Sequence, residues 1–283
     1  ATLYLGDGTG GFTGVQAGLT GVDAGPSSSL GDVNGDDNLD LVITGRDANN
    51  DQTATLYLGD GAGGFTDAEA GLTGVTQGSS SLGDVDGDGA LDLVITGFDG
   101  SDPTATLYLG DGTGGFTDAE AGLTGVTGGS SSLGDVNGDG ALDLVITGSV
   151  GFRDGTATLY LGDGDGGFTD AQAGLTGVGR GSSSLGDVNG DGDLDLVITG
   201  DEDFRDPTAT VYLGDGTGGF TDAQAGLTGV SSGSSSLGDV NGDGTLDLVT
   251  TGDEGNFDPS ATVYENIGAD PVDVVSETQT VSS

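Results

Sequence analysis

The stretch "SLGDVDGDGALDLVITG", residues 81–97, places acids at alternate positions and then runs into β-branched side chains. Its acids are Asp84, Asp86, Asp88 and Asp92. The phrase returns at intervals of 51 or 52 residues, and its successive first acids are Asp32, Asp84, Asp135, Asp187 and Asp239. Self-similarity at a fixed period of this length is typical of a repeat architecture.

A second phrase keeps the same period. "ATLYLGDGTGGFT" starts at Ala1, near-identical copies start at Ala54, Ala105, Ala157 and Ala209, and a shorter copy, "ATVYENIG", starts at Ala261. Each period reads as four short strands: "SSSLGDV" before the acidic turn, "LDLVITG" after it, "TATLYLG", and "GGFTDA" after a glycine-rich turn. The alternation within residues 54–58 is that of a strand. No stretch has a helical period, and 62 glycines disfavour long helices.

Four strands per unit of about 50 residues are typical of a β-propeller blade, whereas β-helix and β-roll coils have far shorter periods. We therefore predict an all-β fold, a β-propeller of four-stranded antiparallel blades. The five acidic loops favour five blades, and the six copies of the third strand leave six blades as the alternative. An open stack of blades is disfavoured because it would leave sheet edges unpaired at both ends.

The repeat also predicts the domain organisation. Its period runs unbroken from Ala1 to about Ile267, so residues 1–267 are expected to form one propeller domain. Residues 268–283, "GADPVDVVSETQTVSS", leave the pattern and form a C-terminal tail, which is a linker, a free tail, or an extra or donated strand. The chain begins at Ala1 and contains no Met, which indicates a processed or excerpted polypeptide.

The charge is extreme: 47 acidic and four basic residues give a formal net charge of −43. Such a surface excludes nucleic acid as a partner and disfavours anionic membranes. Apolar residues at strand spacing argue against disorder, and no apolar run reaches the length of a membrane span. Self-repulsion would be severe in dilute buffer, but at ~1 M salt the screening length is only about 3 Å. The composition therefore favours a halophilic source.

The acidic loop has the spacing of a calcium site. Oxygen-bearing side chains at positions 1, 3, 5 and 9 of a tight turn converge on one point, and position 7 can add its backbone carbonyl. A glycine follows position 5 and permits the turn, except in the first copy, where Asp37 replaces it. The predicted Ca²⁺ ligands, about one ion per repeat, are Asp32, Asn34, Asp36, Asn38, Asp40, Asp84, Asp86, Asp88, Ala90, Asp92, Asp135, Asn137, Asp139, Ala141, Asp143, Asp187, Asn189, Asp191, Asp193, Asp195, Asp239, Asn241, Asp243, Thr245 and Asp247.

Three other calcium-loop families and a metal-free turn compete with this interpretation. An EF-hand requires Glu at position 12, where this chain has Ile or Thr. A dockerin-like loop should run into a helix rather than "LDLVITG", and a nonapeptide calcium roll has a much shorter period. A metal-free Asx turn requires only one or two such side chains, whereas this loop supplies four in every copy.

The phrase "DVNGDGALDLVITG", residues 135–148, with a trailing "LYLGDGTGGFT", resembles the FG-GAP and VCBS-type repeats, the blades of integrin-α-like β-propellers. In that family a D-x-[DN]-x-D-G-x-x-D loop between the first two strands of a blade binds Ca²⁺, chiefly for structure. The resemblance covers about 265 of the 283 residues. Integrin heads have more blades and longer repeats, so the blade number is not implied.

The repeats differ from one another in two places: the connection from the second to the third strand, and the segment before the serine run. In an up-and-down blade both lie at the end opposite the acidic loops. Aromatic and Arg side chains are typical of binding hot spots, which predicts a ligand face there; drift in surface loops is the alternative. The predicted residues are Phe98, Phe152, Arg153, Arg180, Phe204, Arg205 and Phe257.

We expect no enzymatic activity, because His, Cys, Lys, Trp and Met are all absent. Glu202 and Glu254 occur singly in variable loops and keep a two-carboxylate glycosidase as the alternative.

The ends of the chain suggest self-association. The chain opens with a third and fourth strand and closes with a first, second and third. The amino-terminal "GGFT" can complete the last blade, which leaves one third strand for addition to a neighbouring subunit and a non-closing filament. We therefore predict an extracellular or cell-surface structural or adhesive component from a high-salt environment. The alternative is a head domain that binds protein or glycan within a larger surface protein.

Overall fold

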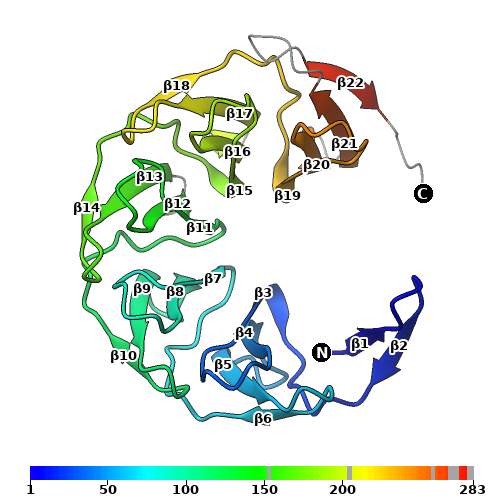
Figure 1. Ribbon diagram of the computed structural model, residues 1–283, viewed down its shortest axis with the longest axis vertical. Helices are drawn as coiled ribbons and strands as arrows, with labels where there is room; N and C mark the ends of the chain where they lie inside the picture. The colour runs from blue at the N-terminus through cyan, green and yellow to red at the C-terminus, as the bar shows by residue number, and fades with distance from the viewer. Residues whose placement is uncertain (152–153, 203–205, 256–258, 267–273, 279–283) are drawn as a thin grey trace. The chain divides into compact units, whose positions relative to one another are not determined.

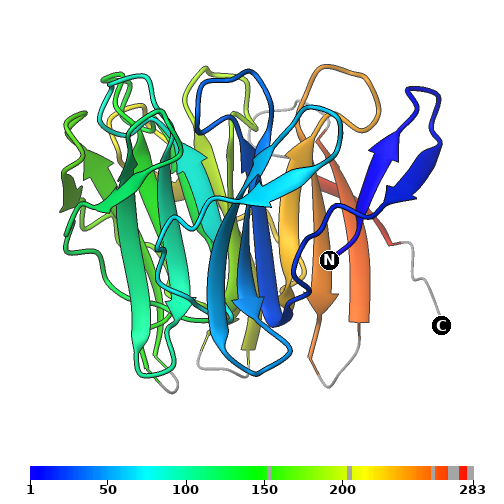
Figure 2. The same cartoon turned by 90° about the horizontal axis from the view of Figure 1, so that it is seen from below.

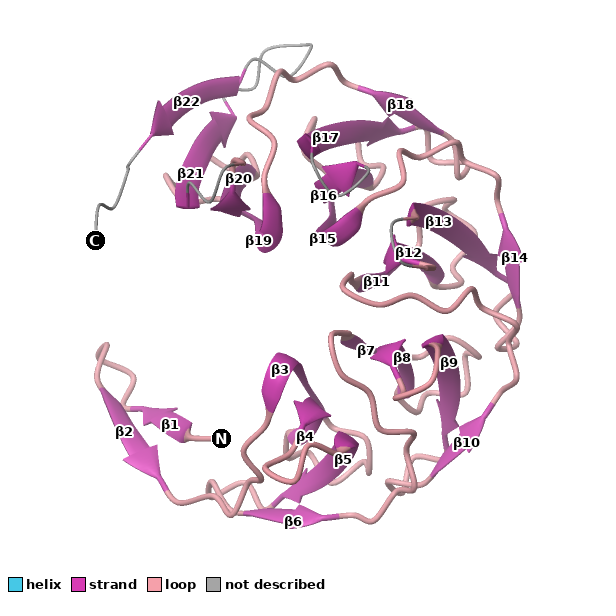
Figure 3. Cartoon of the chain, turned by 180° about the vertical axis from the view of Figure 1, so that it is seen from behind, coloured by secondary structure: helices cyan, strands magenta, loops and turns pink. Residues whose placement is uncertain are grey.

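The computed structural model describes residues 1–151, 154–202, 206–255, 259–266 and 274–278, and these residues form strands, turns and loops without a helix (Figures 1 and 3). The strands make five four-stranded antiparallel sheets and one two-stranded sheet. The prediction of an all-β propeller fold with five four-stranded blades is thus confirmed. The chain divides into two compact units, Ala1–Gly125 and Val126–Ser283.

The first unit contains a hairpin and two blades. The hairpin consists of β1 (Leu3–Gly6) and β2 (Phe12–Val15). The first blade has the order β3 (Asp23–Gly31), β4 (Asp40–Arg46), β5 (Gln52–Gly59) and β6 (Phe65–Asp67). The second blade has the order β7 (Ser80–Gly83), β8 (Asp92–Phe98), β9 (Pro103–Gly110) and β10 (Phe116–Asp118).

The second unit contains three blades with the same topology. The third blade is β11 (Ser131–Gly134), β12 (Asp143–Ser149), β13 (Gly155–Gly162) and β14 (Phe168–Asp170). The fourth is β15 (Gly179–Gly186), β16 (Asp195–Glu202), β17 (Asp206–Gly214) and β18 (Phe220–Asp222). The fifth is β19 (Ser231–Gly238), β20 (Asp247–Asp253), β21 (Pro259–Asn266) and β22 (Val274–Thr278).

The outer strand of the fifth blade differs from the sequence expectation. That strand is β22, which comes from the C-terminal tail and pairs with β21 from Thr262↔Thr278 to Asn266↔Val274. The amino-terminal strand with "GGFT" was expected in this place, but it forms β2, which pairs with β1 in the two-stranded sheet. A β-prone tail can take the outer position because an outer strand pairs along one edge only and needs no repeat motif.

Within each blade the antiparallel order places two kinds of loop at one end. The acidic loop joins the first strand to the second, and the glycine-rich turn joins the third to the fourth, so both lie at the same end of the sheet. Figure 2 shows this for the first blade, where the β3–β4 and β5–β6 loops lie at one end and the β4–β5 connection lies at the other.

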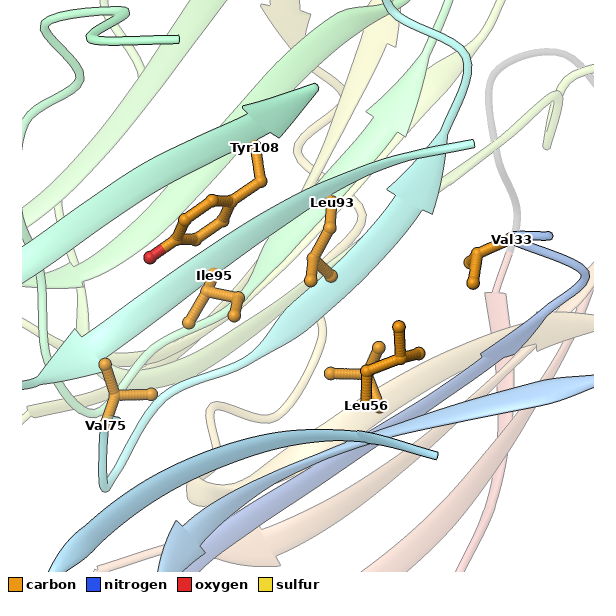
Figure 4. Packing of buried hydrophobic residues seen from close by; sticks show 7 residues of the cluster. Val33, Leu56, Val75, Leu93, Ile95 and Tyr108 are labelled. Carbon is orange, nitrogen blue, oxygen red and sulfur yellow. The ribbon is translucent and has the colours of Figure 1, made fainter. Parts of the chain in front are cut away.

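The second strand of each of the first four blades is buried on both faces, which explains its apolar run. In β8 every residue from Asp92 to Gly97 is buried. Figure 4 shows the cluster between the first two blades, where Leu56 and Val33 of the first blade approach Leu93, Ile95 and Tyr108 of the second.

Neighbouring blades within a unit pack a leucine pair against a glycine. A Cβ placed on Gly31 of the first blade would lie 2.9 and 2.7 Å from the Cδ1 atoms of Leu82 and Leu91 of the second, so only glycine leaves room for both. We call the side of a blade that bears this leucine pair its leucine face, and the side that bears the glycine its glycine face. The fourth and fifth blades repeat the contact with Gly186, Leu237 and Leu246.

The first strands of neighbouring blades are joined by serine hydroxyls. Ser27 Oγ and Ser29 Oγ lie 3.2 and 2.7 Å from Ser80 Oγ. In the second unit, Ser182 Oγ and Ser184 Oγ lie 2.7 and 2.9 Å from Ser235 Oγ. The serine run therefore forms a hydroxyl ladder between blades rather than a solvated loop.

In four blades the tyrosine of the third strand accepts a backbone hydrogen bond from the segment that precedes the blade. The Thr73 N–H donates to Tyr108 Oη at 3.0 Å, and Thr176 N–H donates to Tyr212 Oη at 3.0 Å. Tyr57 and Tyr264 accept in the same way from Thr20 and Thr228.

Replacement of Tyr108 by Phe is expected to destabilise the protein by about 1 kcal/mol, because the Thr73 N–H loses its acceptor in a half-buried position. Thermal unfolding at fixed calcium and salt measures the effect as a fall of a few degrees. Tyr4→Phe is the control, because Tyr4 is 61% exposed. Equal melting temperatures of the two variants would contradict the role of the tyrosine hydroxyl.

Candidate metal centre

Each acidic loop is a short turn between the first and second strands of a blade. In four of the five loops two glycines have left-handed backbone conformations, for example Gly87 (φ +72°) and Gly89 (φ +92°). In the first copy Asp37 takes the position of the second glycine and is held at φ +66°. Asp tolerates this region better than most residues, which explains how the first loop keeps its shape.

The turn brings the predicted oxygen ligands together. In the second blade, carboxylate oxygens of Asp84, Asp86 and Asp88 lie within 4.8 Å of one another. Asp84 Oδ1 is buried and finds no hydrogen-bond partner among the described residues. A buried carboxylate oxygen without a donor is costly, so this atom fits a cation. Hard oxygen donors at this spacing suit Ca²⁺.

Backbone amides hold the position-1 carboxylate in place. In the fourth blade, Asp187 Oδ1 accepts from Gly190 N–H at 2.7 Å, and Asp187 Oδ2 accepts from Gly192 N–H at 3.0 Å. The Asn189 amide donates to Asp191 Oδ2 at 2.8 Å, which aligns positions 3 and 5. The position-1 carboxylate is thus oriented by backbone amides of its own loop.

The position-9 carboxylate has a role that its spacing did not predict. Asp195 is fully buried; its Oδ2 accepts from Val188 N–H at 2.8 Å and its Oδ1 accepts from Gly214 N–H at 2.9 Å. Oδ2 also accepts from Asn189 N–H at 3.3 Å, so Asp195 anchors the loop to the end of the third strand and only its Oδ1 keeps a second lone pair. The other copies repeat these contacts: Asp40 and Asp92 accept at both oxygens from backbone amides.

The loops carry excess negative charge around this anchor. Burial raises the pKa of Asp195, and the nearby Asp191 carboxylate raises it further against the amide hydrogen bonds that lower it. The pKa values of Asp92 and Asp143 are raised by burial in the same way. A bound cation would relieve this charge in each loop.

The variable side chain at position 7 points to a backbone role. The N–H of this residue donates to the position-5 carboxylate in every copy, for example Ala90 to Asp88 at 2.7 Å and Asp193 to Asp191 at 2.9 Å. The residue is thus fixed by its backbone, whichever side chain it carries.

Two residues of the predicted ligand face can be placed. Phe98 ends β8 and exchanges backbone hydrogen bonds with Thr76. Arg180 lies at an irregular point of β15, and its Nη2 and Nε atoms lie 2.7 and 2.9 Å from Asp201 Oδ2. Arg180 therefore has a partner within its own blade. The remaining predicted residues lie outside the described ranges: Phe152, Arg153, Phe204, Arg205 and Phe257.

Replacement of Arg180 by Ala is expected to destabilise the protein by about 1–2 kcal/mol, because Asp201 is only 2% exposed and loses its ion pair. The half-exposed Arg keeps the effect modest. Thermal unfolding measures it, with Ser232→Ala as the control, since Ser232 has a similar positive φ at the corresponding position of the fifth blade. If both variants melt alike, the ion pair contributes nothing.

Five sheets of one topology, each with an acidic loop between its first two strands, define a repeat-built β-propeller. The chain belongs to the FG-GAP-like repeat family, which matches residues 32–95, 84–146, 135–198 and 187–250. Comparison with curated proteins found no match.

Solved structures share the fold at low identity. A variant of the Aleuria aurantia lectin in complex with Fucα1-6GlcNAc aligns with a TM-score of 0.52 at 10% identity, over 96% of this chain and 86% of the lectin. A family 43 arabinoxylan arabinofuranohydrolase from Bacillus subtilis aligns with a TM-score of 0.41 at 12% identity, over 92% and 67% of the two chains. These likenesses show the fold alone. In the described ranges, no helix has the length and apolar character needed to cross a membrane.

Proposed function

We propose that this protein is a non-enzymatic, calcium-stabilised propeller that acts as an extracellular structural or adhesive component of a salt-adapted cell and assembles with itself. The observation that supports it best is the recurrence of the same anchored acidic loop in all five blades. An active site occurs once per chain, whereas an element repeated in every blade serves the framework.

The proposed role of Ca²⁺ is to hold together the first and second strands of each blade at the loop that joins them. Carboxylate and amide oxygens at positions 1, 3 and 5 would hold the ion, with the position-7 carbonyl and a free lone pair of the position-9 carboxylate completing the shell. The bound ion supplies positive charge where the chain gathers its acids. Five such ions would change the formal charge from −43 to −33, so high salt still stabilises the protein.

The alternative of glycosidase chemistry has little support from the site. Glu202 and Glu254 are both exposed and belong to different blades. A general acid of that class needs an environment that keeps its carboxyl protonated, and an exposed carboxylate lacks it.

Self-assembly is supported by the hairpin β1–β2. Strand β1 has β2 on one edge and no pairing on its other edge among the described residues. Open edges of apolar strands are sites of strand addition. Negative-stain microscopy at ~1 M salt with calcium is expected to show filaments. A field of single particles under the same conditions would contradict the assembly.

A second function, a ligand-binding head, has one observation in its favour. A shallow open groove lies at the end of the fifth blade opposite the acidic loop, lined by Ser232, Gly252, Asp253, Pro259 and Ser260. The lectin that shares the fold binds a fucosylated sugar. Titration with Fucα1-6GlcNAc tests this function, with Asp253→Asn as the variant that should weaken binding. If the unaltered protein gives no heat of binding in calorimetry, the ligand-binding function is wrong.

A further inference from the structure

Elsewhere in the chain a leucine face or a glycine face is covered by the neighbouring blade. The leucine face of the first blade and the glycine face of the fifth blade are exposed. On the first blade the leucine face is bare, with Leu30 and Leu39 exposed by 59% and 58%. On the fifth blade the glycine face is bare: Val240 is 56% exposed, and nothing lies within 4 Å of a Cβ placed on Gly238. The matching residue of the fourth blade, Val188, is buried.

These two exposed faces are complementary in the same way as the faces that meet between neighbouring blades of the chain. Between the fourth and fifth blades, a Cβ on Gly186 would lie 2.9 Å from Cδ1 of both Leu237 and Leu246. The hydroxyls of Ser182 and Ser184 meet Ser235 alongside this contact. At the corresponding positions, the first blade offers Leu30, Leu39 and Ser28, and the fifth offers Gly238, Ser234 and Ser236. Ser28, Ser234 and Ser236 are exposed.

The hairpin β1–β2 lies against the first blade as the outer half of a preceding blade would. Leu5 Cδ1 lies 3.1 Å from a Cβ placed on Gly63, just as Leu58 Cδ2 lies 3.4 Å from one on Gly114. Tyr4 and Phe12 are 61% and 73% exposed, whereas in complete blades the corresponding Tyr is buried and the corresponding Phe is half-buried. The hairpin therefore lacks the first and second strands that it would pair with in a blade.

The fifth blade has such strands, β19 and β20, but its outer strands depart from the repeat. Glu265 and Asn266 of β21 replace the Leu–Gly pair found at the end of the other third strands. The Gly-rich turn that leads to the fourth strand is also missing there. In contrast, β1 and β2 carry the full repeat sequence, including Gly6, whose counterpart Gly59 donates its N–H to Asp40.

Building on the self-assembly proposed above, we propose that the leucine face of the first blade binds the glycine face of the fifth blade of a second copy. In this contact β1 and β2 replace β21 and β22 as the outer strands on that copy's β20. A second copy carries the missing half of the interface in the repeat's own register, and a first blade covered by the fifth blade of its own chain would keep the mixed dimer described below at background. The contact is heterologous, so it continues from copy to copy and suits a filament.

Disulfide trapping tests the interface, because the chain has no native Cys. In the covered interface a Cβ on Gly186 would lie 3.8 Å from Leu237 Cβ, which matches the mean separation of about 3.8 Å in disulfides. The equivalent pair across copies is Gly238 and Leu30. A tagged Leu30→Cys chain and an untagged Gly238→Cys chain are mixed at ~1 M salt with calcium and oxidised. The expected product is a mixed disulfide dimer.

Two controls frame this result. The double variant Gly186→Cys/Leu237→Cys should close an internal disulfide, which verifies the geometry on a contact already present. Each single variant oxidised alone sets the background of random dimers. A mixed-dimer yield at this background overturns the proposed interface.

The strand exchange has a separate test. Tyr4→Asp should leave the melting temperature of the separate chain unchanged, because Tyr4 is exposed there. It should lower the mixed-dimer yield about tenfold or more, because the exchange would bury the new carboxylate. Thr9→Asp is the matched control, since the repeat has Asp165 at the corresponding turn position. Equal yields from both variants overturn the exchange.

Microscopy separates this inference from the proposed function. Filaments without the mixed dimer would overturn this interface and leave self-assembly standing. Single particles without the mixed dimer would overturn both.

Discussion

Removal of calcium by excess EDTA is expected to lower the melting temperature by tens of degrees. Extracellular calcium modules bind with Kd of roughly 10⁻⁴ to 10⁻³ M, and a ligand at 100 times its Kd adds ~2.7 kcal/mol per site. Five independent sites would then add roughly 13 kcal/mol, which is comparable with the whole stability of a domain, ~5 to 15 kcal/mol. The calcium-free protein should therefore be barely stable.

The measurement is a pair of thermal melts at one ionic strength, because salt also stabilises so acidic a chain. Return of excess calcium should restore the higher melting temperature, which excludes irreversible damage. An unchanged melt in EDTA would show that the acidic loops are held by their backbone amides alone, and the calcium proposal would fail.

Replacement of Asp195 by Ala is expected to be the most damaging single change in an acidic loop. It leaves the N–H groups of Val188 and Gly214 without their acceptor in buried or half-buried positions. Each unsatisfied donor costs about 1–3 kcal/mol, so the loss should be about 2–6 kcal/mol. Because these contacts need no metal, most of the loss should persist in EDTA.

Asp165→Ala is the matched control, since it removes the same charge from an exposed turn where another repeat has Ala62. Chemical denaturation with and without calcium gives both free energies of unfolding. If Asp195→Ala destabilises the protein only when calcium is present, the residue is a metal ligand and not an anchor of the strands.

The architecture could be predicted because its signals are local and repeated. The period and the alternation within "ATLYLG" indicate four strands per unit, and the structure has them in five blades. The acids at positions 1, 3 and 5 are close in sequence, so a single turn was enough to predict that Asp84, Asp86 and Asp88 converge.

What could not be predicted depends on pairs that are distant in sequence. The anchoring role of Asp195 requires the N–H of Gly214, which the fold brings to it from another strand. The same applies to Arg180, whose partner Asp201 lies on the neighbouring strand, so its side chain resembled a free recognition residue. The sequence left the last outer strand undecided between the amino-terminal "GGFT" and the C-terminal tail, because β22 is held by backbone pairing and carries no repeat motif.

The hydroxyl ladder between first strands has a consequence for how the blades hold together. Ser27, Ser29 and Ser80 are neutral, and either partner of each pair can serve as donor. Attraction between full charges fades as mobile ions accumulate around it, but a hydrogen bond between two alcohols carries no net charge for those ions to mask. A chain with only four basic residues thus joins its sheets through neutral hydrogen bonds, which added salt does not screen.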